Sequence, residues 1–454
     1  MTKILISSGT EAKGGVEMSV WSRAGELAQR TPDARNRYVD FLRAASISVV
    51  VIGHWLMAAA YFEGGALKLG DMLHRAPWMQ WITWVFQVMP LFFIVGGYAN
   101  AASWEAARRT GQGYGQWTSS RLRRLVGPVI PLLIVWSVMA AVAHGFGVHP
   151  QLIKVGSQVA LIPTWFLAVY VMVVIAAPGT YWAWRRFGVW SFWALALSAV
   201  AVDAIAFTSS LGALRWINYV FIWLAVHQLG YMWRGGQIAA PRQALAWAGG
   251  GFAALVFLVL VAGYPVSMIT VPGEAISNSR PPTLALLALG AFHGGLALTL
   301  EPRVRGWLQG LRPWTATVLV NGTIMTLYLW HVTVMVLMVG LANLLGGIGL
   351  GLQPGTGSWW ASRPLWIAFL AVVLSVFVAV FGRFEQTRRA ESTAPFAALR
   401  GITGAVGVCI GLAVLALHGI GSAGMLGVRL APVIVALAGA ALILGAPARR
   451  SAAP

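Results

Sequence analysis

The sequence has little cysteine and little charge. Cys409 is the only cysteine, so no disulfide can form within the chain. Only 10% of the 454 residues are charged, whereas a soluble domain has about 25%. The mean hydropathy is +0.73. A chain of this composition cannot cover its surface with polar groups, which argues against a soluble fold and indicates a membrane protein.

Short catalytic motifs are also missing. The sequence contains no P-loop, no HExxH zinc motif, no C-x-x-C pair and no nucleophile elbow in a convincing context. We therefore expect no bound metal and no permanently bound cofactor. The apolar stretches also lack the chains of acidic residues that many proton-coupled transporters use.

Twelve apolar stretches approach the length of about 20 residues that a bilayer requires. They predict an all-α, polytopic transmembrane helix bundle with a ten-span core over 38–383 and a C-terminal two-span hairpin within 401–454. Residues 1–37 are expected to form a mobile polar tail with a short amphipathic segment at 20–27, and 384–400 a charged cytoplasmic linker. The predicted spans are 41–60, 82–102, 125–144, 165–183, 188–207, 215–233, 244–263, 283–300, 317–341, 365–383, 401–418 and 428–447.

The 32 lysines and arginines predict the orientation. With the N-terminus inside, 24 of them fall in cytoplasmic segments and 7 in the opposite segments, while Arg43 lies inside a span. This asymmetry follows the positive-inside rule and predicts that both termini are cytoplasmic. It also explains the net charge of +19 without a nucleic-acid partner. The many Ala, Gly and Trp residues, with Arg favoured over Lys, indicate a high-GC bacterium, hence a bacterial plasma membrane.

Arg43 and His54 lie in the first predicted span, where ionisable side chains are rare and usually functional. Eleven residues of helix turn by about 1100°, so the two side chains share one face about 16 Å apart. Asp40, three residues before Arg43, can pair with it. This geometry suits an elongated ligand with its anionic end at Arg43 and its reacting end at His54. The alternatives are contact of Arg43 with lipid headgroups and a helix–helix hydrogen bond of His54.

Further polar groups have two interpretations each. His331, in the ninth predicted span, could face the same cavity as His54 or bond another helix. Arg121 and Arg124 precede the third span; guanidinium groups suit phosphate, but such a cluster also fits ordinary positive-inside charge. For the remaining ionisable groups within spans a structural role is expected: Asp203, His227 and His293.

Five stretches between residue 38 and about residue 335 follow one another in a family-specific order. Together they resemble the acyltransferase-3 family of polytopic membrane O-acyltransferases, most of all its actinobacterial members. The resemblance rests on VDFLRAASISVVVIGHW, PLFFIVGGY, RLRRLVGP, WFLAVY and LYLWH. It implies transfer of an acyl group, often acetyl, from cytoplasmic acyl-CoA to a hydroxyl of a carbohydrate or lipid. Glycolipids of the cell envelope would be natural acceptors.

The resemblance also implies roles for residues. His54 would activate the acceptor hydroxyl as a general base or carry a transient acyl group. Arg43 would hold the anionic part of acyl-CoA, and Arg121 and Arg124 its phosphates. The expected catalytic group is Asp40, Arg43, His54 and His331, and the expected donor-binding group is Arg43, Arg121, Arg124, Trp165 and Tyr328.

Two positions depart from the family pattern. Gly96 stands where the family often has serine, so no hydroxyl role is expected there, and Pro128 is shifted by one residue. Two other classes of protein fit the same polar cavity. A transporter or lipid flippase would bind substrate without consuming acyl-CoA, and a membrane scaffold would tolerate replacement of His54.

Overall fold

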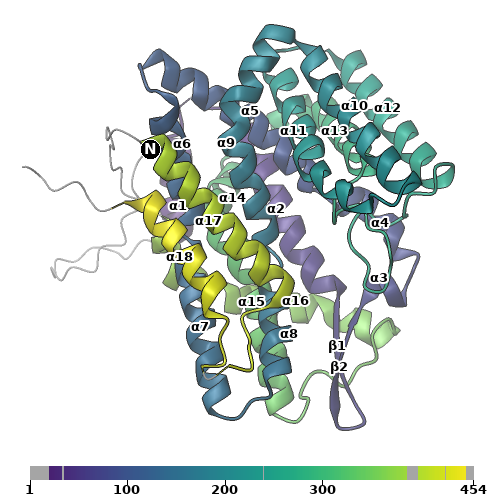
Figure 1. Ribbon diagram of the computed structural model, residues 1–454, viewed down its shortest axis with the longest axis vertical. Helices are drawn as coiled ribbons and strands as arrows, with labels where there is room; N and C mark the ends of the chain where they lie inside the picture. Colours follow the sequence, from purple (N-terminus) through teal and green to yellow (C-terminus); the bar gives the residue numbers. More distant parts are fainter. Residues whose placement is uncertain (1–19, 33–34, 239, 386–396, 425, 446–454) are drawn as a thin grey trace, which may run out of the picture.

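Helices make up almost all of the regular structure in the computed structural model, which describes residues 20–32, 35–238, 240–385, 397–424 and 426–445 (Figure 1). The first elements are α1 (Val20–Gln29), α2 (Arg37–Met57), β1 (Ala58–Glu63), β2 (Ala66–Asp71), α3 (Met72–Arg75), α4 (Met79–Phe86), α5 (Met89–Arg109), α6 (Tyr114–Val126), α7 (Val129–Gly145), α8 (Pro150–Ala160) and α9 (Thr164–Phe187). The later elements are α10 (Val189–Thr208), η1 (Gly212–Ile217), α11 (Asn218–Arg234), α12 (Pro241–Leu260), α13 (Leu284–Trp307), α14 (Leu311–Gly322), α15 (Ile324–Leu344), α16 (Gly357–Phe381), η2 (Gly382–Glu385), α17 (Ala397–His418) and α18 (Leu430–Leu444).

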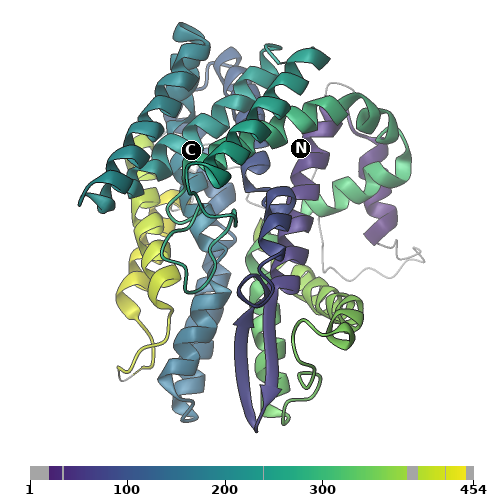
Figure 2. The same cartoon turned by 90° about the vertical axis from the view of Figure 1, so that its right-hand side faces the viewer.

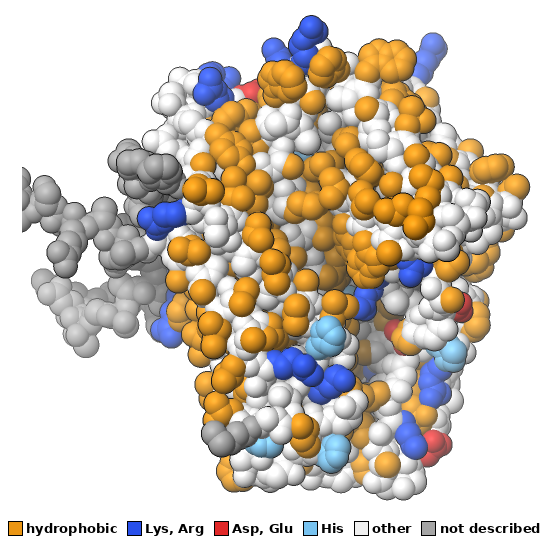
Figure 3. Space-filling view, viewed as in Figure 1, with side chains coloured by type: hydrophobic (Ala, Val, Ile, Leu, Met, Phe, Trp, Pro, Cys, Tyr) orange, Lys and Arg blue, Asp and Glu red, His pale blue; other side chains and the backbone are white. Residues whose placement is uncertain are grey.

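Ten helical segments of the described chain are long and apolar enough to cross a membrane. Helices are the structure expected in a lipid bilayer, because each helix satisfies its backbone hydrogen bonds internally. Large apolar side chains also lie exposed over the bundle surface (Figure 3), as lipid contact requires. The predicted all-α, multi-pass membrane bundle is therefore confirmed.

Two of the twelve predicted spans are shorter than a full crossing. The sixth corresponds to α11, which has 17 residues and is buried along most of its length against α5, α9, α10 and α13. The twelfth corresponds to α18, which has 15 residues. Hydropathy alone could not separate a buried helix from a lipid-facing one, because both are apolar all round.

The second predicted span is broken. α4 ends at Phe86 and α5 begins at Met89, with Gln87 between them. The Gln87 side chain donates to the carbonyl of Met268, and Pro90 in the first turn of α5 has no N–H to continue the α4 ladder. The polar side chain and the proline together explain the break.

A β-hairpin follows α2 directly, in a segment that the sequence predicted to be a loop. β1 and β2 pair antiparallel from Ala58↔Asp71 to Glu63↔Ala66, and the turn is Gly64-Gly65, both with positive φ. Two glycines in this conformation fit a tight two-residue hairpin turn. The hairpin contacts the loop after α15 (Figure 2), where the N–H of Phe62 donates to the carbonyl of Leu350.

The described part of the N-terminal tail is a docked helix, not a mobile chain. α1 packs on α14, and the Trp314 indole donates to the carbonyl of Ala28 and to the hydroxyl of Thr31. Ala24 and Ala28 are buried, which matches the predicted amphipathic segment. Residues 1–19, and 386–396 of the predicted linker, lie outside the described residues.

α17 and α18 form the predicted C-terminal hairpin on one flank of the bundle (Figures 1 and 2). α17 packs along α6 and α9 as well as along α18. A Cβ at Gly404 would lie 2.6 Å from the carbonyl oxygen of Gly439, so the two helices touch through their backbones. Small residues permit this close packing, as the sequence predicted.

Candidate active site

His54 of α2 and His331 of α15 form a direct pair. The Nδ1 atom of His54 lies 2.7 Å from Nε2 of His331. The ring planes are parallel to within 2°, and the ring centroids are 5.0 Å apart. The contact places His331 beside His54 and is at the same time a hydrogen bond between α15 and α2, so both interpretations of His331 are compatible with it.

The hydrogen-bond network fixes which ring nitrogens carry hydrogen. Nδ1 of His331 lies 2.7 Å from the carbonyl oxygen of Tyr328, which can only accept, so Nδ1 is the protonated nitrogen. Nε2 of a neutral His331 then has a free lone pair and accepts from Nδ1–H of His54. Nε2 of a neutral His54 is therefore unprotonated. This is the tautomer that a general base at His54 requires.

The two histidines of the pair differ in their exposure to solvent. His331 is completely buried, whereas His54 is partly exposed. The indole N–H of Trp55 donates to the carbonyl of His331 at 3.0 Å. Two residues further along α15, the indole of Trp136 donates to the hydroxyl of Thr333, also at 3.0 Å. These contacts hold α15 against α2 and α7, so the partly exposed ring is the one that can meet a substrate.

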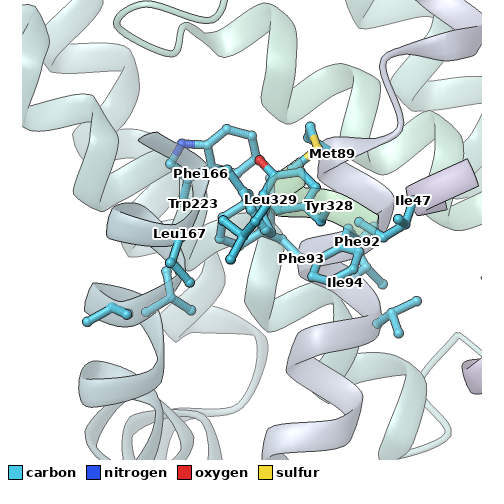
Figure 4. Close-up of a cluster of buried hydrophobic side chains, with 14 of the residues drawn as sticks. Ile47, Met89, Phe92, Phe93, Ile94, Phe166, Leu167, Trp223, Tyr328 and Leu329 are labelled. Atoms are coloured by element: carbon cyan, nitrogen blue, oxygen red, sulfur yellow. The ribbon is translucent and has the colours of Figure 1, made fainter. Parts of the chain in front are cut away.

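Phe166 and Tyr328 belong to a buried cluster of large apolar side chains (Figure 4). The Tyr328 ring is 6.0 Å from the His331 ring and 5.3 Å from Phe166, and its hydroxyl donates to the carbonyl of Pro163. Trp165 is partly buried and lies 6.2 Å from Phe166. Tyr328 is thus a packing residue whose hydroxyl is already used by the fold, and Trp165 borders the same cluster.

At the start of α2, Asp40 forms ion pairs with two arginines. Its carboxylate lies 2.5 Å from Nε of Arg35 and 3.5 Å from a terminal nitrogen of Arg43. The predicted pairing of Asp40 with Arg43 is therefore present. The Asp40 backbone carbonyl also accepts from the Asn321 side chain at 2.8 Å, which ties this turn of α2 to α14.

Arg121 and Arg124 of α6 lie close enough to Arg43 for their charges to interact. Arg124 also interacts with the charges of Arg35 and Glu385. Beside them, a pocket of about 300 Å³ opens between the start of α2 and α5. Its lining includes Arg35, Asn36, Asp40, Arg43, Tyr98 and Ser103. Arg121, Arg124 and Glu385 do not line this pocket but lie near enough for their charges to act on its neighbourhood. Four guanidinium groups against two carboxylates give the region a net positive charge suited to an anion.

Residues 36–384 match the family model described as an acyltransferase domain, which is three-quarters of the chain. The chain belongs to the acyltransferase-3 family. It is accordingly a multi-pass membrane acyltransferase. No curated protein and no solved structure matched the chain. The histidine pair, Arg43, Arg121 and Arg124 lie within the matched residues, Arg35 lies just before them, and the α17–α18 hairpin lies after them.

Other ionisable groups of the acyltransferase are used inside the fold. His227 lies 3.2 Å from the side-chain nitrogen of Asn100, and His293 lies 2.9 Å from the carbonyl of Trp84. Asp203 accepts hydrogen bonds from three groups on other segments. All three are buried, and the structural role expected for them agrees with these contacts.

Two residues near the site were not singled out from the sequence. Trp55 follows His54 directly and looks like one more apolar residue of a span. Glu385 lies just after α16, and its carboxylate accepts from the N–H groups of Met325 and Thr326 at the start of α15. A carboxylate suits the positive end of a helix. No signal in the sequence connects residue 385 with residue 325, because the contact is made by tertiary packing alone.

Proposed function

We propose that this enzyme transfers an acyl group, most simply acetyl, from acyl-CoA to a hydroxyl of an envelope carbohydrate or glycolipid. We place it in a bacterial plasma membrane with both termini cytoplasmic, so that the arginine cluster faces the compartment that contains CoA. The observation that carries the proposal is the pairing of His54 with His331, because it uses Nδ1 of His54 and leaves Nε2 free to accept a proton.

The proposed reaction follows from this tautomer. Nε2 of His54 takes the proton of the acceptor hydroxyl while the oxygen attacks the thioester carbonyl carbon. The new C–O bond forms, the C–S bond breaks, and the leaving thiolate takes the proton back from His54 to give free CoA. During the transfer His54 is positively charged, and the lone pair on Nε2 of His331 accepts its Nδ1–H. That hydrogen bond stabilises the charge and holds the ring in place.

The spacing along α2 supports an elongated donor. Arg43 and His54 lie on one uninterrupted helix, eleven residues and about 16 Å apart. Arginine forks suit phosphate oxygens, so the nucleotide end of acyl-CoA would lie at Arg43, Arg121 and Arg124, with the thioester at His54.

The acceptor would approach His54 from the opposite end of α2. This helix ends at Met57, three residues after His54. The surface is hollowed near this end, between α9 and the α3–α4 segment (Figures 1 and 3). We infer that the acceptor enters by this hollow, while the donor enters by the arginine side.

Transfer of label from acetyl-CoA tests the proposal. Membrane vesicles with wild type, His54→Ala or the control His418→Ala, at matched expression, receive labelled acetyl-CoA and an envelope extract. The control removes an exposed histidine of α17 far along the chain from the pair. Label should enter glycan or glycolipid, with release of free CoA, for wild type and the control but not for His54→Ala.

The same experiment separates the competing classes. A transporter or flippase would release no CoA in any sample. Equal transfer by wild type and His54→Ala would contradict the role proposed for His54. Label found in one chemical fraction would identify the acceptor class.

A further inference from the structure

Tyr170 of α9 packs beside α6, the helix that carries Arg121 and Arg124. Its ring packs against Phe92, Phe93 and Phe166, with centroid distances of 5.7 to 5.8 Å. The residue is only partly buried, and its hydroxyl has no hydrogen-bond partner among the described residues. A packed ring with a free hydroxyl is an arrangement that serves ligands, because tyrosine combines an apolar body with a polar tip.

Gly96 of α5 makes room for this hydroxyl. A Cβ at position 96 would lie 2.8 Å from the Tyr170 oxygen and 2.9 Å from the nearest ring carbon. Real Cβ atoms do not come so close, so any side chain at position 96 would push the tyrosine away. The position of the hydroxyl thus depends on two residues, Tyr170 and Gly96, from neighbouring helices.

The charges around Tyr170 define what it can bind. Tyr170 packs against the small apolar cluster around Trp117 of α6, four residues before Arg121, and is near enough to Arg121 and Arg124 to influence their charges. Arg121 is in no ion pair within the described part of the chain, and its guanidinium lies over the Trp117 ring at 5.6 Å. Guanidinium groups only donate hydrogen bonds, so a ligand held by them must accept. A phenol O–H beside two arginines is a third donor for the same kind of acceptor.

Tyr170 also lies on the side of the arginines that leads to the histidines. Its ring stacks on Phe166, which contacts Tyr328, which in turn contacts His331. Tyr170 therefore lies between α6 with its arginines and the packed aromatic side chains beside His331. The hydroxyl is placed to meet the phosphate end of a donor that reaches from the arginines to His54.

We propose that Tyr170 is a donor-binding residue whose hydroxyl donates a hydrogen bond to a phosphate oxygen of acyl-CoA between Arg121 and Arg124. This inference rests on the proposed function, since it assumes acyl-CoA as donor. It makes the Gly96–Tyr170 pair a determinant of donor affinity and leaves the chemical step at His54 unchanged.

The test compares two donors in Tyr170→Phe, which keeps the ring and removes only the oxygen. The control is Tyr219→Phe in α11, whose ring stacks on Trp216 away from the arginines. The purified proteins are compared for CoA affinity by calorimetry and for transfer from acetyl-CoA and from S-acetylpantetheine, which has no phosphate. Tyr170→Phe should bind CoA about tenfold more weakly and raise KM for acetyl-CoA by a similar factor, with kcat almost unchanged. Transfer from S-acetylpantetheine should be equal in wild type and Tyr170→Phe.

A second variant reports on the same contact. Gly96→Ala should weaken CoA binding as Tyr170→Phe does, and the double variant should be little weaker than either single variant, because both remove one hydrogen bond. Unchanged CoA affinity in Tyr170→Phe would overturn the proposal, as would an equal loss with both donors. If wild type itself bound no CoA, the proposed function would fail, and this result differs from either of those.

Discussion

The pairing of His331 with His54 predicts the effect of removing a residue that touches no substrate. His331→Leu removes the lone pair that accepts from His54 at 2.7 Å. It fills the same completely buried position with an apolar side chain of similar size. His331→Gln places an amide oxygen near the former Nε2 and so keeps an acceptor. His54 itself is unchanged in both variants.

The size of the effect follows from the charge that His54 carries during transfer. A hydrogen bond to a charged group contributes about 1.5 to 3 kcal/mol, and each 1.36 kcal/mol is about tenfold in rate. His331→Leu should therefore lower kcat about 10- to 150-fold. The donor KM should change little, because the arginines that would hold the donor lie at the other end of α2. His331→Gln should recover much of the lost rate.

The assay is the initial rate of CoA release and acyl transfer in proteoliposomes, with thermal unfolding in detergent as the control for folding. His54→Ala alone should lower the rate about 10²- to 10⁴-fold, the usual contribution of a general base. Adding His331→Leu to His54→Ala should cost almost nothing more, because the two residues act as one unit. The reasoning is refuted if a folded His331→Leu stays within twofold of wild type, or if its effect multiplies with that of His54→Ala.

Three further variants test other parts of the structure. Arg121→Gln should raise KM for acetyl-CoA about tenfold or more with a smaller change in kcat, measured in the same assay; an unchanged KM would contradict its role at the phosphates. In Gly97→Ala the new Cβ would overlap the carbonyl oxygen of His227, so α5 and α11 must separate at a cost of about 1–3 kcal/mol; Gly249→Ala, with open space around it, should leave the unfolding temperature unchanged. Glu385→Gln removes a carboxylate from the start of α15 and should destabilise by about 0.3–1 kcal/mol, seen as a lower unfolding temperature; an unchanged temperature would show that the cap is not needed.

Local patterns predicted the elements that depend on local physics. The spacing of Arg43 and His54 is preserved because α2 is uninterrupted from Arg37 to Met57. The i, i+3 position of Asp40 predicted its contact with Arg43, and hydropathy located the long spans. Each of these follows from helix geometry or bilayer thickness, which act over a few turns.

Features that depend on tertiary packing could not be predicted. His54 and His331 are 277 residues apart. The family resemblance placed them in one group, but periodicity could not show that their rings touch. The docking of α1 needs Trp314 as a partner, and the free hydroxyl of Tyr170 needs the absence of a side chain at position 96. The missing Cβ of Gly96 in α5 cannot be inferred from the sequence around Tyr170 in α9, the residue that occupies the space.

The contacts of the C-terminal hairpin bear on where this enzyme can be divided. The recognised acyltransferase domain ends at residue 384, yet the thiol of Cys409 donates to the carbonyl of Ala168, and the hydroxyl of Ser157 accepts from the N–H of Ile420. A Cβ on Gly115 would lie 3.1–3.4 Å from atoms of Ala398, so α6, which carries Arg121 and Arg124, is packed against residues beyond the domain. The packed structural unit of this protein therefore extends beyond the residues that match the family model. A chain cut at residue 384 would lose the packing of α17 against α6 and α9.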